Sequence, residues 1–290
     1  MPADKPQLEW YNAQHPLLLL QLRSQGKEIV PLNIKLTPDD RILIISGPNA
    51  GGKSVCLKTV GLTQYMLQCG MPVIMGEDSR MGVFDSVFID IGDEQSIEND
   101  LSTYSSHLSN MKFFLKYCGP KSLILIDEFG TGTEPNIGGA IAEAELEIFN
   151  SKQSYGVITT HYTNLKHIAS QTPGLINGAM LYDRGRMEPL FQLQIGTPGS
   201  SFAIEIAKKI GLPSEIIASA TEKVGSEHID YDKNIQDAAR DKRYWESKRE
   251  QIRIKERKMD EAMTELHKRL DSIEKERKEI LRNAKDEAKE

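Results

Sequence analysis

The sequence has few cysteines, few aromatic residues and no long apolar run. Cys56, Cys69 and Cys118 are its three cysteines, and they show neither the C-x-x-C spacing nor the spacing of metal ligands. They therefore indicate buried thiols in a reducing compartment. No apolar stretch approaches the roughly 18 residues of a membrane span, and residues 1–5 lack the charged and apolar regions of a signal peptide. We expect a cytoplasmic protein with no membrane partner.

An excess of positive charge is also missing. The formal net charge is −6, so no global basic field attracts nucleic acid, although a local basic face is compatible with this charge. With 290 residues, 39% of them hydrophobic, the chain can build one large domain or two smaller ones. From about residue 235 to the end the sequence contains no glycine or proline, which sets this charged segment apart.

A glycine-rich loop between a strand-like and a helix-like segment is the strongest motif. It follows the apolar residues 41–46 and precedes the helical pattern of residues 55–67. This is the context of a P-loop, in which glycines let backbone N–H groups surround phosphate oxygens at a helix N-terminus. The alternative is an ordinary glycine turn. We predict a site for ATP and Mg²⁺ formed by Gly47, Pro48, Asn49, Ala50, Gly51, Gly52, Lys53, Ser54 and Val55, with Lys53 on the phosphates and Ser54 on the metal.

A second motif places two carboxylates after an apolar strand. Ser122 to Ile126 predict a buried parallel strand, and Asp127 and Glu128 follow it at the edge where open α/β sheets bind ligands. Asp127 would hold Mg²⁺, and Glu128 would orient or deprotonate the attacking water. The alternative is a pair of surface carboxylates, which the P-loop upstream disfavours.

Three further features bear on the site. His161 ends a predicted strand, residues 156–161, next to the Asp127 strand, so we place it at the γ-phosphate, with a structural histidine as the alternative. His107 and His167 lie on helical segments and are given no function. Ser102 or Thr103 would cap a helix that reaches Tyr117, and this helix N-terminus would either be only capped or also face an anion.

Upstream of the P-loop, residues 28–36 alternate well enough for a strand. Such a strand could carry the nucleotide base on Ile29, Val30 and Leu32, with core packing as the alternative. Elsewhere we predict that the P-loop helix ends at Gly70, that residues 17–20 lie in the core and that residues 181–188 contain a hairpin-like turn. We also predict strands at 73–75, 86–91 and 191–195, and helices at 136–149, 202–210 and 214–224.

The C-terminal segment carries a heptad pattern. Apolar residues recur every seven positions and a companion series partly fills the second seam position. We predict a coiled coil with a second copy or with an outside helix, whereas the alternative is a single charged helix. The pattern runs to Glu290 without a cap, which suggests a piece of a longer protein. The first series is Ala238, Trp245, Ile252, Met259, Leu266, Ile273 and Ile280, and the companions are Met263, Leu270 and Ala284.

These motifs, in this order, resemble the MutS family of ABC-type P-loop ATPases over roughly residues 10 to 225. The P-loop resembles the family's GPNMGGKS, with Ala50 in place of its Met. Ala50, Glu134-Pro135 and the acidic loop at residues 93–96 are most similar to the second bacterial MutS branch, which lacks the mismatch-recognition domain. The other matching segments are His15-Pro16, Ser102-Thr103-Tyr104, residues 127–133, Thr159-Thr160-His161 and residues 199–204.

The resemblance implies a fold and an activity. It implies an α/β, ABC-type ATPase domain with a mainly parallel sheet at residues 1–195, a small helical dimerisation appendage at 196–230 and a coiled-coil arm at 231–290. Lys53, Glu128 and His161 would hydrolyse ATP in cis, while Ser102 would contact the γ-phosphate held by a partner protomer. ATP would then drive a homodimeric clamp in recombination control or branched-DNA handling, with the DNA bound mostly by regions outside this chain.

Other functions remain open at this point. The second branch is also compatible with ribosome-associated quality control. A nucleotide-latched scaffold with negligible turnover is a further alternative, although Glu128 argues against it. A transporter subunit is disfavoured because the chain lacks a Leu-Ser-Gly-Gly-Gln motif. No segment resembles the nuclease-type Smr domain of the branch, so no nuclease activity is expected here.

Overall fold

The computed structural model describes residues 3, 5–48, 51–92, 103–183, 186 and 188–224. Further described residues are 241, 244–245, 248–249, 251–253, 255–260, 262–270, 272–273, 275–276 and 278. They fall into two units, Met1–Gln236 and Asp237–Glu290, which are described separately. Among the helices formed by these residues, none combines the length and the apolar character needed to cross a bilayer.

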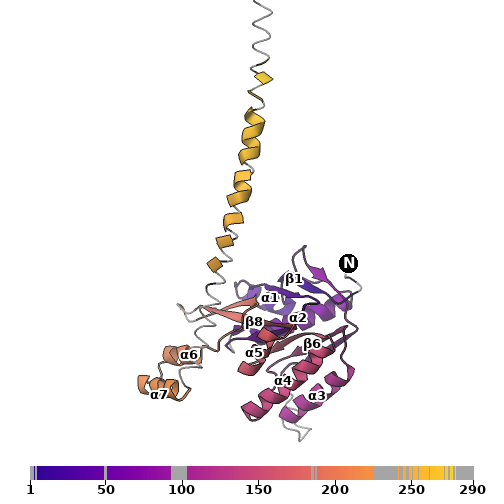
Figure 1. Ribbon diagram of the computed structural model, residues 1–290, viewed down its shortest axis with the longest axis vertical. Coiled ribbons are helices and arrows are strands. Elements are labelled where there is room, and N and C mark those ends of the chain that lie inside the picture. The colour runs from indigo at the N-terminus through magenta and orange to yellow at the C-terminus, as the bar shows by residue number, and fades with distance from the viewer. Residues whose placement is uncertain are drawn as a thin grey trace, which may run out of the picture. The chain divides into compact units, whose positions relative to one another are not determined.

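A six-stranded sheet forms the centre of the first unit (Figure 1). The P-loop strand β3 (Asp40–Ser46) pairs in parallel with β7 on one side and β8 on the other, which explains why residues 42–45 are all fully buried. Strand β9 closes one edge by an antiparallel hairpin with β8. The strand order is β5 (Ser86–Asp90), β6 (Ser122–Ile126), β7 (Tyr155–Thr159), β3, β8 (Gly174–Asp183) and β9 (Glu188–Ile195).

Layers cover both faces of this sheet, and alternate residues of β3 enter different cores. Leu43 and Ile45 pack with helix α2 (Lys53–Gln68) and with a smaller sheet. Ile42 and Ile44 pack with α3 (Thr103–Tyr117), α4 (Pro135–Ser151) and α5 (Thr163–Gln171). The smaller sheet is antiparallel, in the order β2 (Leu32–Leu36), β1 (Leu8–Ala13) and β4 (Arg80–Met81).

Several sequence predictions for this unit are confirmed. The mainly parallel α/β sheet is present, and strands β5 and β6 and helix α3 lie where the patterns place them. The hairpin-like turn joins β8 to β9. Two short helices, α6 (Ala203–Ile210) and α7 (Ser214–Val224), follow β9 and have no buried residues.

Other predictions are wrong in detail. Residues 73–75 form no strand, and β2 begins at Leu32, so residues 28–31 lie outside it. The four leucines at 17–20 belong to helix α1 (Pro16–Ser24), which His15 caps through its Nδ1. One face of α1 points to solvent, so Leu17 and Leu20 are 66% and 65% exposed while Leu19 is buried. Strand β1 was not anticipated, because the residues before it looked irregular.

The described residues of the second unit are helical and exposed. Its apolar side chains, which belong to the predicted heptad series, are between 49% and 66% exposed: Trp245, Ile252, Met259, Met263, Leu266, Leu270 and Ile273. Ala238, Ile280 and Ala284 of that series lie outside the described residues. Pairing of this helix in a coiled coil therefore stays a prediction, as do the three domain boundaries.

Candidate nucleotide site

The glycine-rich loop connects the end of β3 to the first turn of α2. Gly47 and Gly52 have φ angles of 138° and 93°, a backbone conformation that other residues rarely adopt. A Cβ on Gly52 would also come within 3.2 Å of the Phe191 ring. The sequence therefore needs glycine at both ends of the loop. Asn49 and Ala50, which we also assigned to nucleotide binding, lie outside the described residues, and Val55 is exposed on the first turn of α2.

Lys53 lies with its ammonium group folded back onto the loop. Its side chain is buried, with 3% of the residue exposed, and Nζ donates a hydrogen bond to the Gly47 carbonyl oxygen at 2.8 Å. Burial lowers the pKa of Lys53 to about 8; the carboxylates of Glu128 and Asp127 oppose this shift, and the charge of Lys166 adds to it. A buried ammonium group with a lowered pKa is suited to an anionic ligand, which would favour its charged form.

His161 lies beside this lysine, directly after strand β7 and the following Thr160. Its Nε2 is 3.3 Å from Lys53 Nζ. Partial desolvation lowers the pKa of His161 to about 4, and the positive charges of Lys53 and Lys166 contribute. The ring is therefore neutral at pH 7, and since Nζ is a donor, Nε2 accepts the hydrogen bond. The structure thus brings two of the three predicted catalytic groups together.

The third predicted group, Glu128, follows Asp127 at the carboxyl end of β6. A single hydroxyl organises both residues: Thr159 Oγ1 donates to Asp127 Oδ1 at 2.5 Å and accepts from the Glu128 N–H at 2.8 Å. Thr159 is fully buried at the end of β7. Glu128 itself has a φ angle of 50°, in the left-handed region. Strand β7 therefore fixes the Asp127 carboxylate and the backbone of Glu128, whose own side chain is exposed.

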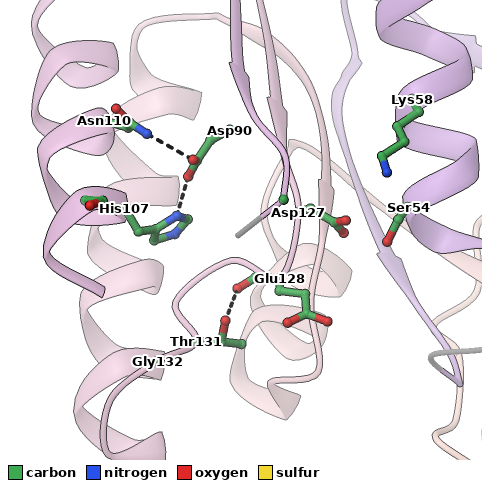
Figure 2. A pocket seen from close by; sticks show the side chains of 11 residues that line it. Ser54, Lys58, Asp90, His107, Asn110, Asp127, Glu128, Thr131 and Gly132 are labelled. Carbon is green, nitrogen blue, oxygen red and sulfur yellow. Dashed lines mark hydrogen bonds and ion pairs between the residues drawn. The ribbon is translucent and has the colours of Figure 1, made fainter. Parts of the chain in front are cut away.

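Asp127 and Glu128 border a cavity of about 570 Å³, whose lining does not include Lys53, His161 or Thr159 (Figure 2). Ser54 and Lys58 of α2 line one side, and Asp127 and Glu128 line another. A hydroxyl and a carboxylate are oxygen ligands of the kind that Mg²⁺ prefers. Among the described residues no group of three or more His, Cys, Asp or Glu side chains could hold a metal.

Sequence reasoning missed part of the cavity wall. Asp90, at the end of β5, forms an ion pair with His107 Nδ1 and accepts a hydrogen bond from Asn110 Nδ2 at 3.1 Å. All three side chains line the cavity. We predicted no function for His107, and the structure places its side chain in the cavity wall. Asp90 could have been predicted from the sequence, because it is a polar residue at the end of a strand that neighbours β6.

Two other predicted contributions, the base contacts and Ser102, are not tested by the described residues, except for Leu32. Leu32 is buried in the core with the smaller sheet, so core packing accounts for it. Val30 is exposed and Ile29 half-buried ahead of β2, and their contact with a nucleotide base stays a prediction. Ser102 lies outside the described residues, immediately before α3.

Comparisons with known proteins identify the family of the chain. Residues 43–227 match a family model described as MutS domain V. A protein named Endonuclease MutS2 from Levilactobacillus brevis is 36% identical over 286 residues, which cover 99% of this chain and 36% of the relative. Its namesake from Pelotomaculum thermopropionicum is 46% identical over 216 residues, covering 74% of this chain and 27% of the relative.

A third relative of the same name, from Thermomicrobium roseum, is 43% identical over 218 residues, covering 73% of this chain and 28% of the relative. The chain thus spans between 27% and 36% of the length of these curated relatives. The family match begins within β3 and contains the P-loop, the two carboxylates and His161. The chain belongs to the MutS family and is similar to its MutS2 members.

Proposed function

We propose that this chain binds ATP with Mg²⁺ in the cavity and hydrolyses it, as the nucleotide-driven part of a DNA-processing protein. The observation that carries the proposal is the convergence of Ser54, Asp127 and Glu128 on one cavity, beside the buried Lys53. These are the phosphate, metal and water-activating groups of a P-loop ATPase. The match to MutS domain V supports the same activity.

The geometry supports a role for each side chain. Lys53 would bind phosphate oxygens, and His161 would orient its ammonium group through the Nε2 acceptor. Ser54 and Asp127 would hold Mg²⁺, which when bound neutralises and orients the phosphate oxygens. Glu128 would accept the proton of the attacking water. Thr159 would keep the Asp127 carboxylate and the Glu128 backbone in place through its single hydroxyl.

A homodimer with composite sites is the finer part of the proposal. Ser102, at the N-terminus of α3, would contact the γ-phosphate held by the partner protomer, so that ATP joins two subunits and hydrolysis releases them. The helices α6 and α7 would form the dimerisation appendage. Exposed apolar side chains on these helices and between them support this, because Ile210 of α6, Leu212 of the connection and Ile216 of α7 are 74%, 42% and 53% exposed.

The whole-protein role is proposed from the relatives. The name endonuclease belongs to proteins of which this chain matches at most 36%, and we assign to the chain their nucleotide-driven step and no nuclease chemistry. We propose recombination control or branched-DNA handling as the role, with most DNA contacts made by regions outside the chain. Ribosome-associated quality control is the second candidate that the second-branch features favour.

The test is ATPase specific activity measured as a function of protein concentration. A composite site predicts that specific activity rises with concentration, that Ser102→Ala removes most of it, and that Glu128→Gln traps an ATP-bound dimer. Flat specific activity with unaffected Ser102→Ala would show that each protomer works alone. ATP binding without turnover at any concentration would favour the nucleotide-latched scaffold.

A further inference from the structure

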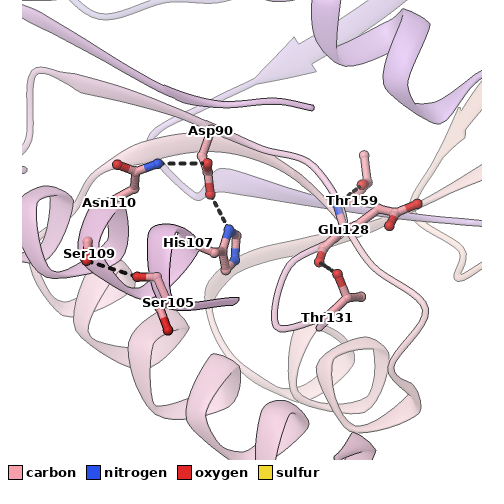
Figure 3. Close-up of polar contacts among 8 residues, drawn as sticks. All are labelled: Asp90, Ser105, His107, Ser109, Asn110, Glu128, Thr131 and Thr159. Carbon is pink, nitrogen blue, oxygen red and sulfur yellow. Dashed lines mark hydrogen bonds and ion pairs between the residues drawn. The ribbon is translucent and has the colours of Figure 1, made fainter. Parts of the chain in front are cut away.

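The carboxylate of Asp90 connects helix α3 to the central sheet (Figure 3). Asp90 ends strand β5, and both of its oxygens are engaged by α3: His107 Nδ1 pairs with Oδ2, and Asn110 Nδ2 donates to Oδ1 at 3.1 Å. His107 and Asn110 are three residues apart in the first two turns, so they share one face of the helix. Two contacts of this kind fix both the position and the rotation of those turns.

The backbone of Asp90 is also hydrogen-bonded to Asp127, the residue that follows β6. The Asp90 carbonyl oxygen accepts a hydrogen bond from the Asp127 N–H at 2.9 Å. The side chains of His107 and Asp90 are only 14% and 11% exposed, and the Phe129 ring meets the imidazole edge-on with a centroid distance of 6.2 Å. Ordered surroundings of this kind leave the imidazole little freedom to move.

We infer that His107 is a positioning residue, which with Asn110 holds the N-terminus of α3 against Asp90 so that the helix can act on the partner's nucleotide. This inference rests on the proposed composite site, because the residue placed there, Ser102, immediately precedes α3. Displacing a contact by about 1 Å can lower a rate about a hundredfold. His107 also lines the protomer's own cavity, but the Asp127 N–H is held there by the Asp90 backbone carbonyl and not by the side-chain pair. Loss of the His107–Asp90 pair should therefore displace α3 and impair the partner's site more than the protomer's own.

A mixing experiment separates these two sites. A Lys53→Ala protomer cannot bind nucleotide but keeps its own α3, whereas a His107→Ala protomer keeps its P-loop and has a displaced α3. Each variant alone should lose at least about tenfold in ATPase activity. In an equal mixture about a quarter of the parent's specific activity should return, because half of randomly paired dimers carry one restored site of two.

The outcomes are distinguishable when Ser102→Ala is mixed with Lys53→Ala in parallel. Recovery with both variants supports the inference. Recovery with His107→Ala alone also supports it, and assigns the trans contact to a residue other than Ser102. Recovery with Ser102→Ala alone overturns the inference and leaves the proposed function standing. No recovery in either mixture removes the composite site, and the inference with it.

Matched variants exclude a general loss of structure. His107→Asn keeps a donor near the position of Nδ1 and should retain most of the activity, whereas Asn110→Leu removes the second donor and should reproduce the mixing result of His107→Ala. Ser109→Ala lies on the same helix, where the hydroxyl donates to the Ser105 carbonyl instead, and should behave as the parent. A His107→Ala protein that no longer binds a fluorescent ADP analogue would contradict a role confined to the partner's site.

Discussion

At the scale of single residues, Lys53 carries a charge that burial disfavours until an anion is bound. Its pKa of about 8 should rise when phosphates occupy the loop. ADP binding near pH 8 should therefore take up about half a proton, whereas binding near pH 6 should take up almost none. Calorimetric binding enthalpies in buffers of different ionisation enthalpy measure this uptake.

The control for this measurement is Lys53→Arg. A guanidinium group stays protonated throughout this pH range, so ADP binding to the variant should take up no proton near pH 8. Equal uptake by the parent and the variant would assign the proton to another group and contradict the pKa shift of Lys53.

We expect substitution of Thr159 to lower both the stability of the protein and its ATPase activity. Thr159→Val keeps the shape but leaves the part-buried Glu128 N–H without its partner and releases Asp127 Oδ1. We expect a loss of about 1–3 kcal/mol in the free energy of unfolding and a fall of about 10- to 100-fold in ATPase activity. Thr159→Ser keeps the hydroxyl and should remain close to the parent. Steady-state ATPase assays and urea unfolding check both values, and a fully active valine variant would refute this role.

The sequence predicts site residues well where a local motif carries them. The P-loop glycines, Lys53 and the pair Asp127–Glu128 are such cases, because strand, loop and helix context is visible in adjacent residues. His107 and Thr159 are different, since their partners lie 17 and 32 positions away on other strands. Only the parallel register of β5, β6 and β7 brings them together, and a single sequence does not display that register.

At the scale of elements, the contact between α3 and α4 contains a carboxyl group with a perturbed pKa. Burial raises the pKa of Glu145, on α4, to about 7, although the positive charge of His107 opposes the shift. Because this pKa lies above the unfolded value of 4.5, the associated stability is complete below about pH 4.5 and is lost as the pH rises through about 7.

Glu145→Gln should therefore be relatively more stable at alkaline pH. Between about pH 5 and pH 8.5 the parent should lose up to about 3 kcal/mol in free energy of unfolding relative to this variant. Urea unfolding at both pH values measures the difference. Glu147→Gln, at an exposed position of the same helix, is the control. If the free energy of unfolding changed equally with pH in the parent and in Glu145→Gln, the raised pKa of Glu145 would be contradicted.

Elements were predictable where periodicity is strong and were missed where it is not. Helix α7 and strand β6 coincide with their patterns. Residues 73–75 are apolar but form no strand, because three such residues cannot by themselves distinguish a strand from a connecting segment. The leucines of α1 were misassigned since four consecutive apolar residues on a helix must point in different directions.

At the scale of the whole molecule, the described residues of the second unit carry exposed apolar side chains that the heptad prediction places in a seam with a second copy. The double variant Ile252→Asn and Leu266→Asn should weaken self-association, because each buried side chain contributes about 1.5–3 kcal/mol. We expect the dissociation constant of the dimer to rise at least about a hundredfold. Sedimentation velocity over a concentration series measures it.

The matched control changes two lysines that the heptad places away from this seam. Lys268→Gln and Lys275→Gln should leave the dissociation constant of the dimer within about threefold of the parent, as exposed charges contribute little. If the asparagine variant associates as well as this control, the arm does not pair with its own copy, and an outside helix becomes the preferred partner.

The central place of β3 has a consequence for how the chain matures during synthesis. The P-loop strand leaves the ribosome before both of its neighbours, β7 and β8, which are translated later. Strand β3 cannot pair with both neighbours until residue 183 has emerged, and this delay exposes the nascent chain to misfolding and to chaperones. A nucleotide site that depends on these neighbours should therefore form only after both have been translated.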